Sequence, residues 1–76
     1  MNRSCIFRNG GPSAMVVWVE PWCDEIAVPA GSSLTIISHG EQLEHAPTIE
    51  RTEAGLTFWP EGETYTAELD GAPYPV

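Results

Sequence analysis

The chain has 76 residues, of which 11 are acidic and three are basic, all three arginine, so its formal net charge is −8. One domain is expected over residues 1–76, because splitting a chain of this length would leave pieces too small to enclose a core. The charge argues against nucleic acids and anionic membranes as partners, since proteins bind both through lysine and arginine.

Short apolar segments that alternate with polar residues predict an all-β fold. Prolines and glycines, seven of each, fall mostly between these segments, where their backbone preferences favour turns. We expect a small antiparallel β-sandwich or open barrel of about seven short strands. The predicted strands cover residues 4–8, 14–20, 24–28, 34–39, 48–53, 56–59 and 64–69.

Two hairpins are expected in the first half of the chain, around residues 9–13 and 29–33, and the second would pair Val28 with Leu34. The connection at 20–24 does not fit a simple hairpin, because a loop of 21–23 would place Val17 and Ile26 on opposite faces. A bulge or a crossing to a second sheet is therefore expected there.

The C-terminal half predicts a three-stranded meander. A two-residue loop at Ala54-Gly55 would pair Glu53 with Leu56, and a four-residue loop at 60–63 would pair Trp59 with Thr64. Because side chains alternate between the two faces of a strand, one face of this meander is apolar and the other carries threonine and glutamate. The apolar face comprises Ile49, Leu56, Phe58, Tyr65, Ala67 and Leu69.

The two cysteines, Cys5 and Cys23, are expected to stay reduced. A hairpin around 9–13 would place Cys5 near Val17 and about 20 Å from Cys23, whereas a disulfide needs Cα atoms within about 7 Å. The first eight residues lack the apolar stretch of a signal peptide. A cytoplasmic location is therefore expected.

A short pattern connects the chain with other proteins. The sequence contains Glu20-Pro21-Trp22, followed by Pro29-Ala30-Gly31 and later by Trp59-Pro60. In these motifs it resembles a set of short, acidic, uncharacterised bacterial proteins with an EPW…PPG pattern, over residues 7–40. The resemblance implies a bacterial source and a compact β fold, and it implies no activity and no site residues.

Candidate reactive residues are few. His39, Glu41, Glu44 and His45 lie within seven residues, but a strand would bring together only the first two, and no helical metal-binding motif is present. Cys5 lacks a sequence pattern that would make it a nucleophile. We therefore predict no catalytic residue, no metal ligand and no cofactor. A small metal-binding or enzymatic domain using His39, His45 and Cys5 is kept as an alternative.

The three tryptophans suggest a binding surface. Trp59 falls on the threonine and glutamate face of the meander and Trp22 falls in a turn, and exposed tryptophan is a common anchor of protein interfaces. We predict a non-enzymatic module of the immunity-protein or nucleic-acid-mimic type that binds a basic protein through an acidic face. The predicted binding residues are Trp59, Trp22, Glu50, Glu61, Glu63 and Glu68.

Two simpler interpretations stand beside this one. A second sheet could cover Trp59 and make it a core residue. The charge could also serve solubility alone, in a structural domain with no dedicated site.

Overall fold

The computed structural model describes residues 1–41, 43 and 46–76. Within these residues the chain forms eight strands and no helix, so the fold is all-β as predicted. The strands are β1 (Asn2–Arg8), β2 (Met15–Val19), β3 (Asp24–Val28), β4 (Ser33–His39), β5 (Thr48–Thr52), β6 (Gly55–Trp59), β7 (Thr64–Leu69) and β8 (Ala72–Tyr74). The first seven agree with the predicted segments to within two residues at each end, and β8 was not predicted.

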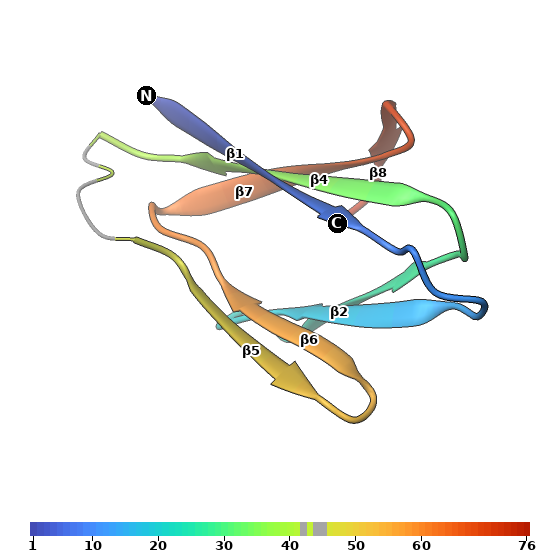
Figure 1. Ribbon diagram of the computed structural model, residues 1–76. Coiled ribbons are helices and arrows are strands. Elements are labelled where there is room, and N and C mark those ends of the chain that lie inside the picture. The colour runs from blue at the N-terminus through green and yellow to red at the C-terminus, as the bar shows by residue number, and fades with distance from the viewer. Residues whose placement is uncertain (42, 44–45) are drawn as a thin grey trace.

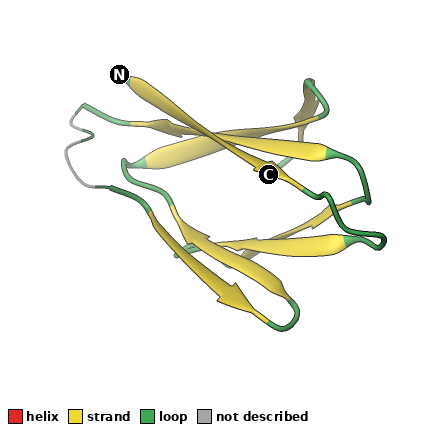
Figure 2. Cartoon of the chain, in the orientation of Figure 1, coloured by secondary structure: helices red, strands yellow, loops and turns green. Residues whose placement is uncertain are grey.

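In the described part of the chain, the strands make two four-stranded sheets (Figures 1 and 2). Sheet A has the order β1-β4-β7-β8, and sheet B has the order β3-β2-β6-β5. Neighbouring strands are antiparallel except β2 and β6, which are parallel and place Val17 opposite Leu56. The expectation of a purely antiparallel arrangement is therefore wrong. No helix among the described residues is long and apolar enough to cross a membrane.

One apolar core lies between the two sheets. Phe7 of sheet A meets Phe58 of sheet B edge to face, with ring centroids 4.9 Å apart, and Phe58 is only 1% exposed. Both sheets contribute alternate residues, as expected for strands with one buried face. The buried apolar side chains of this core are Phe7, Leu34, Ile36, Tyr65 and Ala67 from sheet A, and Val17, Val19, Ile26, Val28 and Phe58 from sheet B.

Three predicted hairpins are wrong, because the loops at 9–13, 29–33 and 60–63 each carry the chain from one sheet to the other. β1 pairs with β4, so Cys5 lies opposite Ile36 and not beside Val17. Likewise β3 does not pair with β4, and β6 does not pair with β7. Both cysteines are free thiols.

The connection between β2 and β3, in contrast, is a hairpin within sheet B. Its loop has four residues, Glu20 to Cys23, and this even number places Val17 directly opposite Ile26. The peptide bond before Pro21 is cis, and Cys23 has a φ of 59°. The expected bulge or sheet crossing at this position is wrong, because the prediction assumed a loop that was one residue shorter.

β5 and β6 form the predicted hairpin, but their register is shifted by two residues from the predicted one. Thr52 pairs with Gly55 and Arg51 pairs with Leu56, so the turn residues are Glu53 and Ala54. A shift of two residues leaves every side chain on its predicted face.

Candidate protein-binding face

The outward face of sheet B carries tryptophan and glutamate on neighbouring strands. The ladder aligns Trp18 with Glu25 of β3 on one side and with Thr57 of β6 on the other. Thr57 in turn lies opposite Glu50 of β5. This row faces outward because it alternates along each strand with buried residues such as Val17 and Phe58.

Trp59 lies one step further along the same face. It pairs with Thr48 of β5, and its side chain is 38% exposed. On its other side the backbone N–H of Glu20 donates to the carbonyl oxygen of Phe58 at 2.9 Å, which continues the parallel ladder and places Glu20 beside Trp59. Sheet A lies on the opposite side of sheet B, so no second sheet covers Trp59 in the described structure. We call Trp18, Trp59, Glu20, Glu25 and Glu50 the Trp–Glu face.

Two of the predicted binding residues, Trp59 and Glu50, belong to this face, whereas Glu68 lies far from it. Glu68 is in β7 of sheet A, opposite Thr35, and points away from the core on the other side of the molecule. The prediction grouped it with Trp59 because it assumed that β6 and β7 form a hairpin.

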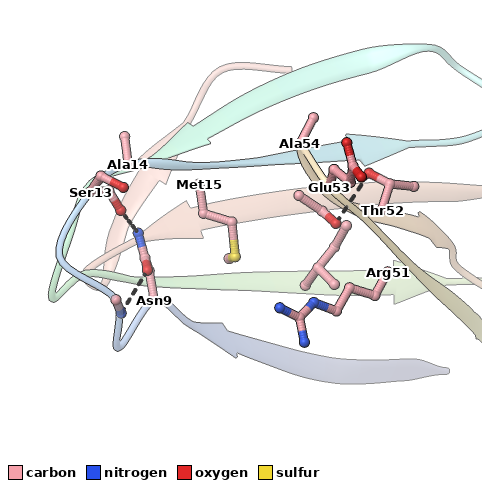
Figure 3. Close-up of a pocket in the computed structure, with 11 residues that line it drawn as sticks. Asn9, Ser13, Ala14, Met15, Arg51, Thr52, Glu53 and Ala54 are labelled. Carbon is pink, nitrogen blue, oxygen red and sulfur yellow. Dashed lines mark hydrogen bonds between the residues drawn. The ribbon is translucent and has the colours of Figure 1, made fainter.

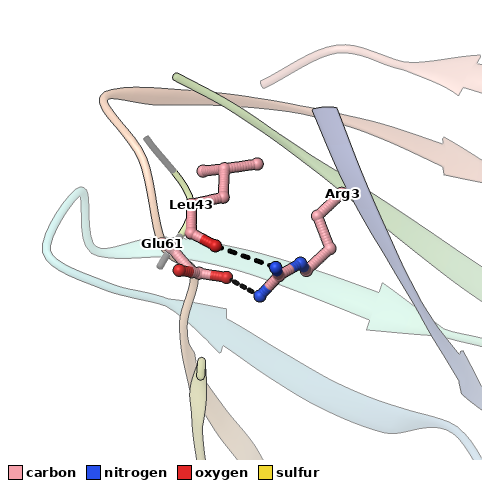
Figure 4. A network of polar contacts seen from close by, with 3 residues as sticks. All are labelled: Arg3, Leu43 and Glu61. Atoms are coloured by element: carbon pink, nitrogen blue, oxygen red, sulfur yellow. Dashed lines mark hydrogen bonds and ion pairs between the residues drawn. The ribbon is translucent and has the colours of Figure 1, made fainter. Parts of the chain in front are cut away.

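Glu61 is held in an ion pair with Arg3 (Figure 4). The second guanidinium nitrogen of Arg3 donates to the carbonyl oxygen of Leu43 at 2.8 Å, and the Glu61 side chain is only 6% exposed. Glu63 is exposed, but its backbone N–H donates to the carbonyl oxygen of His39 at 2.9 Å, on the sheet A side of the crossover loop. Neither carboxylate is part of the Trp–Glu face.

Trp22, in the loop between β2 and β3, packs against Tyr65 of sheet A with ring centroids 5.0 Å apart. The Tyr65 hydroxyl donates to Oδ2 of Asp24 at 2.5 Å. Burial, together with this hydrogen bond and the Asp24 charge, raises the pKa of Tyr65 far above its usual range. Trp22 is as exposed as Trp59, at 38%, but it packs toward sheet A and is therefore not part of the Trp–Glu face.

Cys5 and His39, the two described residues of the metal or enzyme alternative, do not lie together. Cys5 packs against the core, and burial raises the pKa of its thiol. His39 lies on the outward face of sheet A, where its ring nitrogens contact Asn2 at 2.8 Å and Thr66 at 2.9 Å. His45 lies outside the described residues. Among the described residues, no three histidine, cysteine or acidic side chains are grouped as metal ligands would be.

The prediction missed Trp18, Glu20 and Glu25. A signal for the first two was present, since Trp18 and Glu20 alternate with Val17 and Val19, which are both completely buried. Glu25 shares this face through the hairpin of β2 and β3, which the prediction rejected. Glu50 shares it only through the parallel pairing of β2 with β6, and no local pattern indicates that pairing.

Comparison with known proteins gives no further assignment: no family model, no curated protein and no solved structure matches this chain.

Proposed function

We propose that this protein is a non-enzymatic binding module that docks a basic protein on the Trp–Glu face. The observation that carries the proposal is the exposed ring of Trp59 between Thr48 and Glu20, with Glu50 two residues from Thr48 on the same strand. A large aromatic ring provides contact area that can be desolvated, and surrounding charges guide the approach of the partner.

Charge complementarity supports a basic partner. The chain carries a net charge of −8, and no arginine lies on the Trp–Glu face. A surface of this kind fits the positively charged active site of a nuclease, and an immunity-protein or nucleic-acid-mimic role is our specific hypothesis. Electrostatic steering would accelerate the encounter.

The architecture and setting that we propose are a small β-sandwich in the bacterial cytoplasm. A sandwich, as opposed to an open barrel, is supported by the absence of any strand pairing between the two sheets among the described residues. Two free thiols support a reducing compartment. The EPW…PAG pattern at residues 20–31 supports the bacterial source.

The test is binding kinetics with a panel of basic nucleases, measured at low and high salt. We expect at least one of them to bind with an association rate that falls steeply as salt rises, because salt screens exposed charges within about 10 Å at 0.1 M. Trp59→Ala should mainly raise the dissociation rate. Glu50→Gln should mainly lower the association rate.

Glu68→Gln is the matched control, because it removes the same charge from the opposite side of the molecule. If it slows association as much as Glu50→Gln does, binding depends on net charge alone and the Trp–Glu face is not the site. If no basic protein binds, the acidic charge is better explained as a solubility device.

A further inference from the structure

The two sheets are offset, so that one strand of sheet B extends past sheet A. The contact between Phe7 and Phe58 places β1, the edge strand of sheet A, over β6 and not over β5. Ile49 and Arg51 of β5 point to the same side as Phe58 and Leu56, yet both are exposed, Ile49 by 50%. The inward side of β5 is therefore not covered by sheet A at these residues.

This uncovered region is concave. Between the loop after β1 and the turn of β5 and β6 lies a cavity of about 240 Å³ (Figure 3). Met15 and Leu56 are partly exposed at its base, and Arg51 lines it from β5. The side chain of Asn9 is fixed in its wall, donating to the carbonyl oxygens of Ser13 at 2.8 Å and Val28 at 2.9 Å.

The edge of β1 beside this region has free backbone groups. The N–H of Asn9 donates to Ser32 at 2.9 Å, and the N–H of Gly40 donates to Met1 at 3.2 Å, so odd-numbered residues face β4. Bonded and non-bonded pairs alternate along an antiparallel ladder. The groups that point away from β4 are therefore those of Asn2, Ser4, Ile6 and Arg8.

Among the described edge strands, β1 is the least protected against pairing. It is the longest of them, with seven residues, contains no proline, and leaves Ile6 68% exposed, although it carries Arg3 and Arg8. β8 is three residues long and contains Pro73, while β3 and β5 have five residues each. Short length, proline and charge are the usual devices that prevent strand addition.

We propose that β1 accepts an extended, acidic segment of a partner protein as an additional strand of sheet A. An added strand would lie over β5 and cover Ile49, and a carboxylate on its inward side would meet Arg51. A second copy of β1 fits less well, because this strand has no carboxylate that could meet the exposed guanidinium of Arg51. This site is separate from the Trp–Glu face, which lies on the outward side of sheet B.

Two synthetic peptides of about nine residues test the proposal. Both alternate valine with polar residues, and one carries glutamate where the other carries lysine. We expect the glutamate peptide to shift the backbone amide signals of Ser4 and Ile6 in NMR titrations and to slow their hydrogen exchange. The lysine peptide should bind at least about tenfold more weakly, and Arg51→Gln should reduce this preference.

Ile6→Pro removes an edge N–H without removing a bond to β4, so it should weaken binding by about tenfold or more, whereas Ile6→Thr keeps the N–H and should bind normally. A peptide methylated on its backbone nitrogens gives the same test without altering the protein. Equal binding of the methylated peptide, or shifts confined to Trp18 and Trp59, would overturn the proposal. So would shifts of Ser4 and Ile6 that depend only on the protein's own concentration, since these indicate a second copy.

Discussion

Phe58 is the largest completely buried side chain among the described residues, and it joins the two sheets through its contact with Phe7. Phe58→Ala should lower the free energy of unfolding by about 3–5 kcal/mol, because it leaves a cavity as well as losing apolar burial. Chemical denaturation measures this loss. Ile49→Ala is the control, since Ile49 is half exposed, and it should cost much less. A loss below about 1 kcal/mol for Phe58→Ala would contradict the assignment of this face to the core.

Cys23 is exposed but should react slowly. Its Sγ lies 3.6 Å from Oε2 of Glu20, and the negative charge of Glu20 is the main factor that raises the pKa of the thiol. Because the thiolate is the reactive form, Glu20→Gln should accelerate alkylation of Cys23 by iodoacetamide at pH 8. Mass spectrometry of the two cysteine peptides follows the rates separately, and Cys5 is the internal control. An unchanged rate at Cys23 would show that Glu20 does not control this thiol.

At the scale of residues, the sequence predicted the buried faces well. Val28 and Leu34 were expected to lie on the same side, and both are in the core. Buried and exposed side chains alternate along a single strand, so this pattern can be recognised without knowing which strands pair. The outward placement of Trp59 with Glu50 follows from the same rule, whereas the position of Glu68 depends on the pairing of β7 and was predicted wrongly.

Among the elements, the pairing of β6 with β2 depends on a single glycine at the start of β6. Gly55 has a φ of 155°, and a Cβ atom placed there would lie 2.0 Å from the carbonyl oxygen of Val16 in the adjacent β2. Gly55→Ala must therefore displace β6 from β2, and we expect it to cost about 2 kcal/mol or more of unfolding free energy. Gly10→Ala is the matched control, because a Cβ atom at Gly10 meets nothing within 4 Å. Similar thermal midpoints for the two variants would contradict this account of Gly55.

The turn between β7 and β8 predicts acid sensitivity. Asp70 Oδ1 accepts the backbone N–H of Ser33 at 2.9 Å, and this bond is the main cause that lowers the pKa of Asp70 below its ordinary value of 3.8. The stabilisation by ionised Asp70 is complete above that value and is lost as the pH falls through the folded-state pKa. The difference in melting temperature between wild type and Asp70→Asn should be constant near neutral pH and should shrink below pH 4. A difference that persists at low pH would show that the carboxylate charge is not involved.

The same turn explains why β8 was missed. Asp70 and Gly71 both have positive φ, and Asp-Gly between two extended segments is the typical signal of a two-residue hairpin. The signal was therefore in the sequence, although the segment after it contains Pro73, and proline is uncommon inside strands. A proline is tolerated there because β8 is the edge of sheet A, where it pairs only with β7.

Strand positions were predictable and strand partners were not, for a geometric reason. A short loop such as 60–63 places Phe58 and Tyr65 toward one core whether it makes a hairpin or crosses between facing sheets. Side-chain alternation is the same in both cases, so a test based on it cannot separate them. Only contacts between distant segments, such as Val16 with Gly55, decide the topology.

For the whole molecule, the charge of −8 implies self-repulsion in the folded state. Raising sodium chloride from low to moderate concentration at neutral pH should therefore raise the melting temperature. The rise should be roughly 3 °C if screening increases the free energy of unfolding by somewhat less than 1 kcal/mol. Differential scanning calorimetry measures the change. The same salt series near pH 4.3, where the chain is close to its isoelectric point, should have little effect. A salt effect of equal size at both pH values would exclude self-repulsion as its cause.

The alternation of the chain between the two sheets also bears on its synthesis. Each sheet contains strands from both halves of the sequence: β2 needs β6, and β4 needs β7 to fill the centre of its sheet. A nascent chain with only its first half outside the ribosome can therefore complete neither sheet. The apolar faces of its strands stay exposed to solvent until the second half emerges. Folding of this domain is thus expected to begin only once β7 has left the exit tunnel.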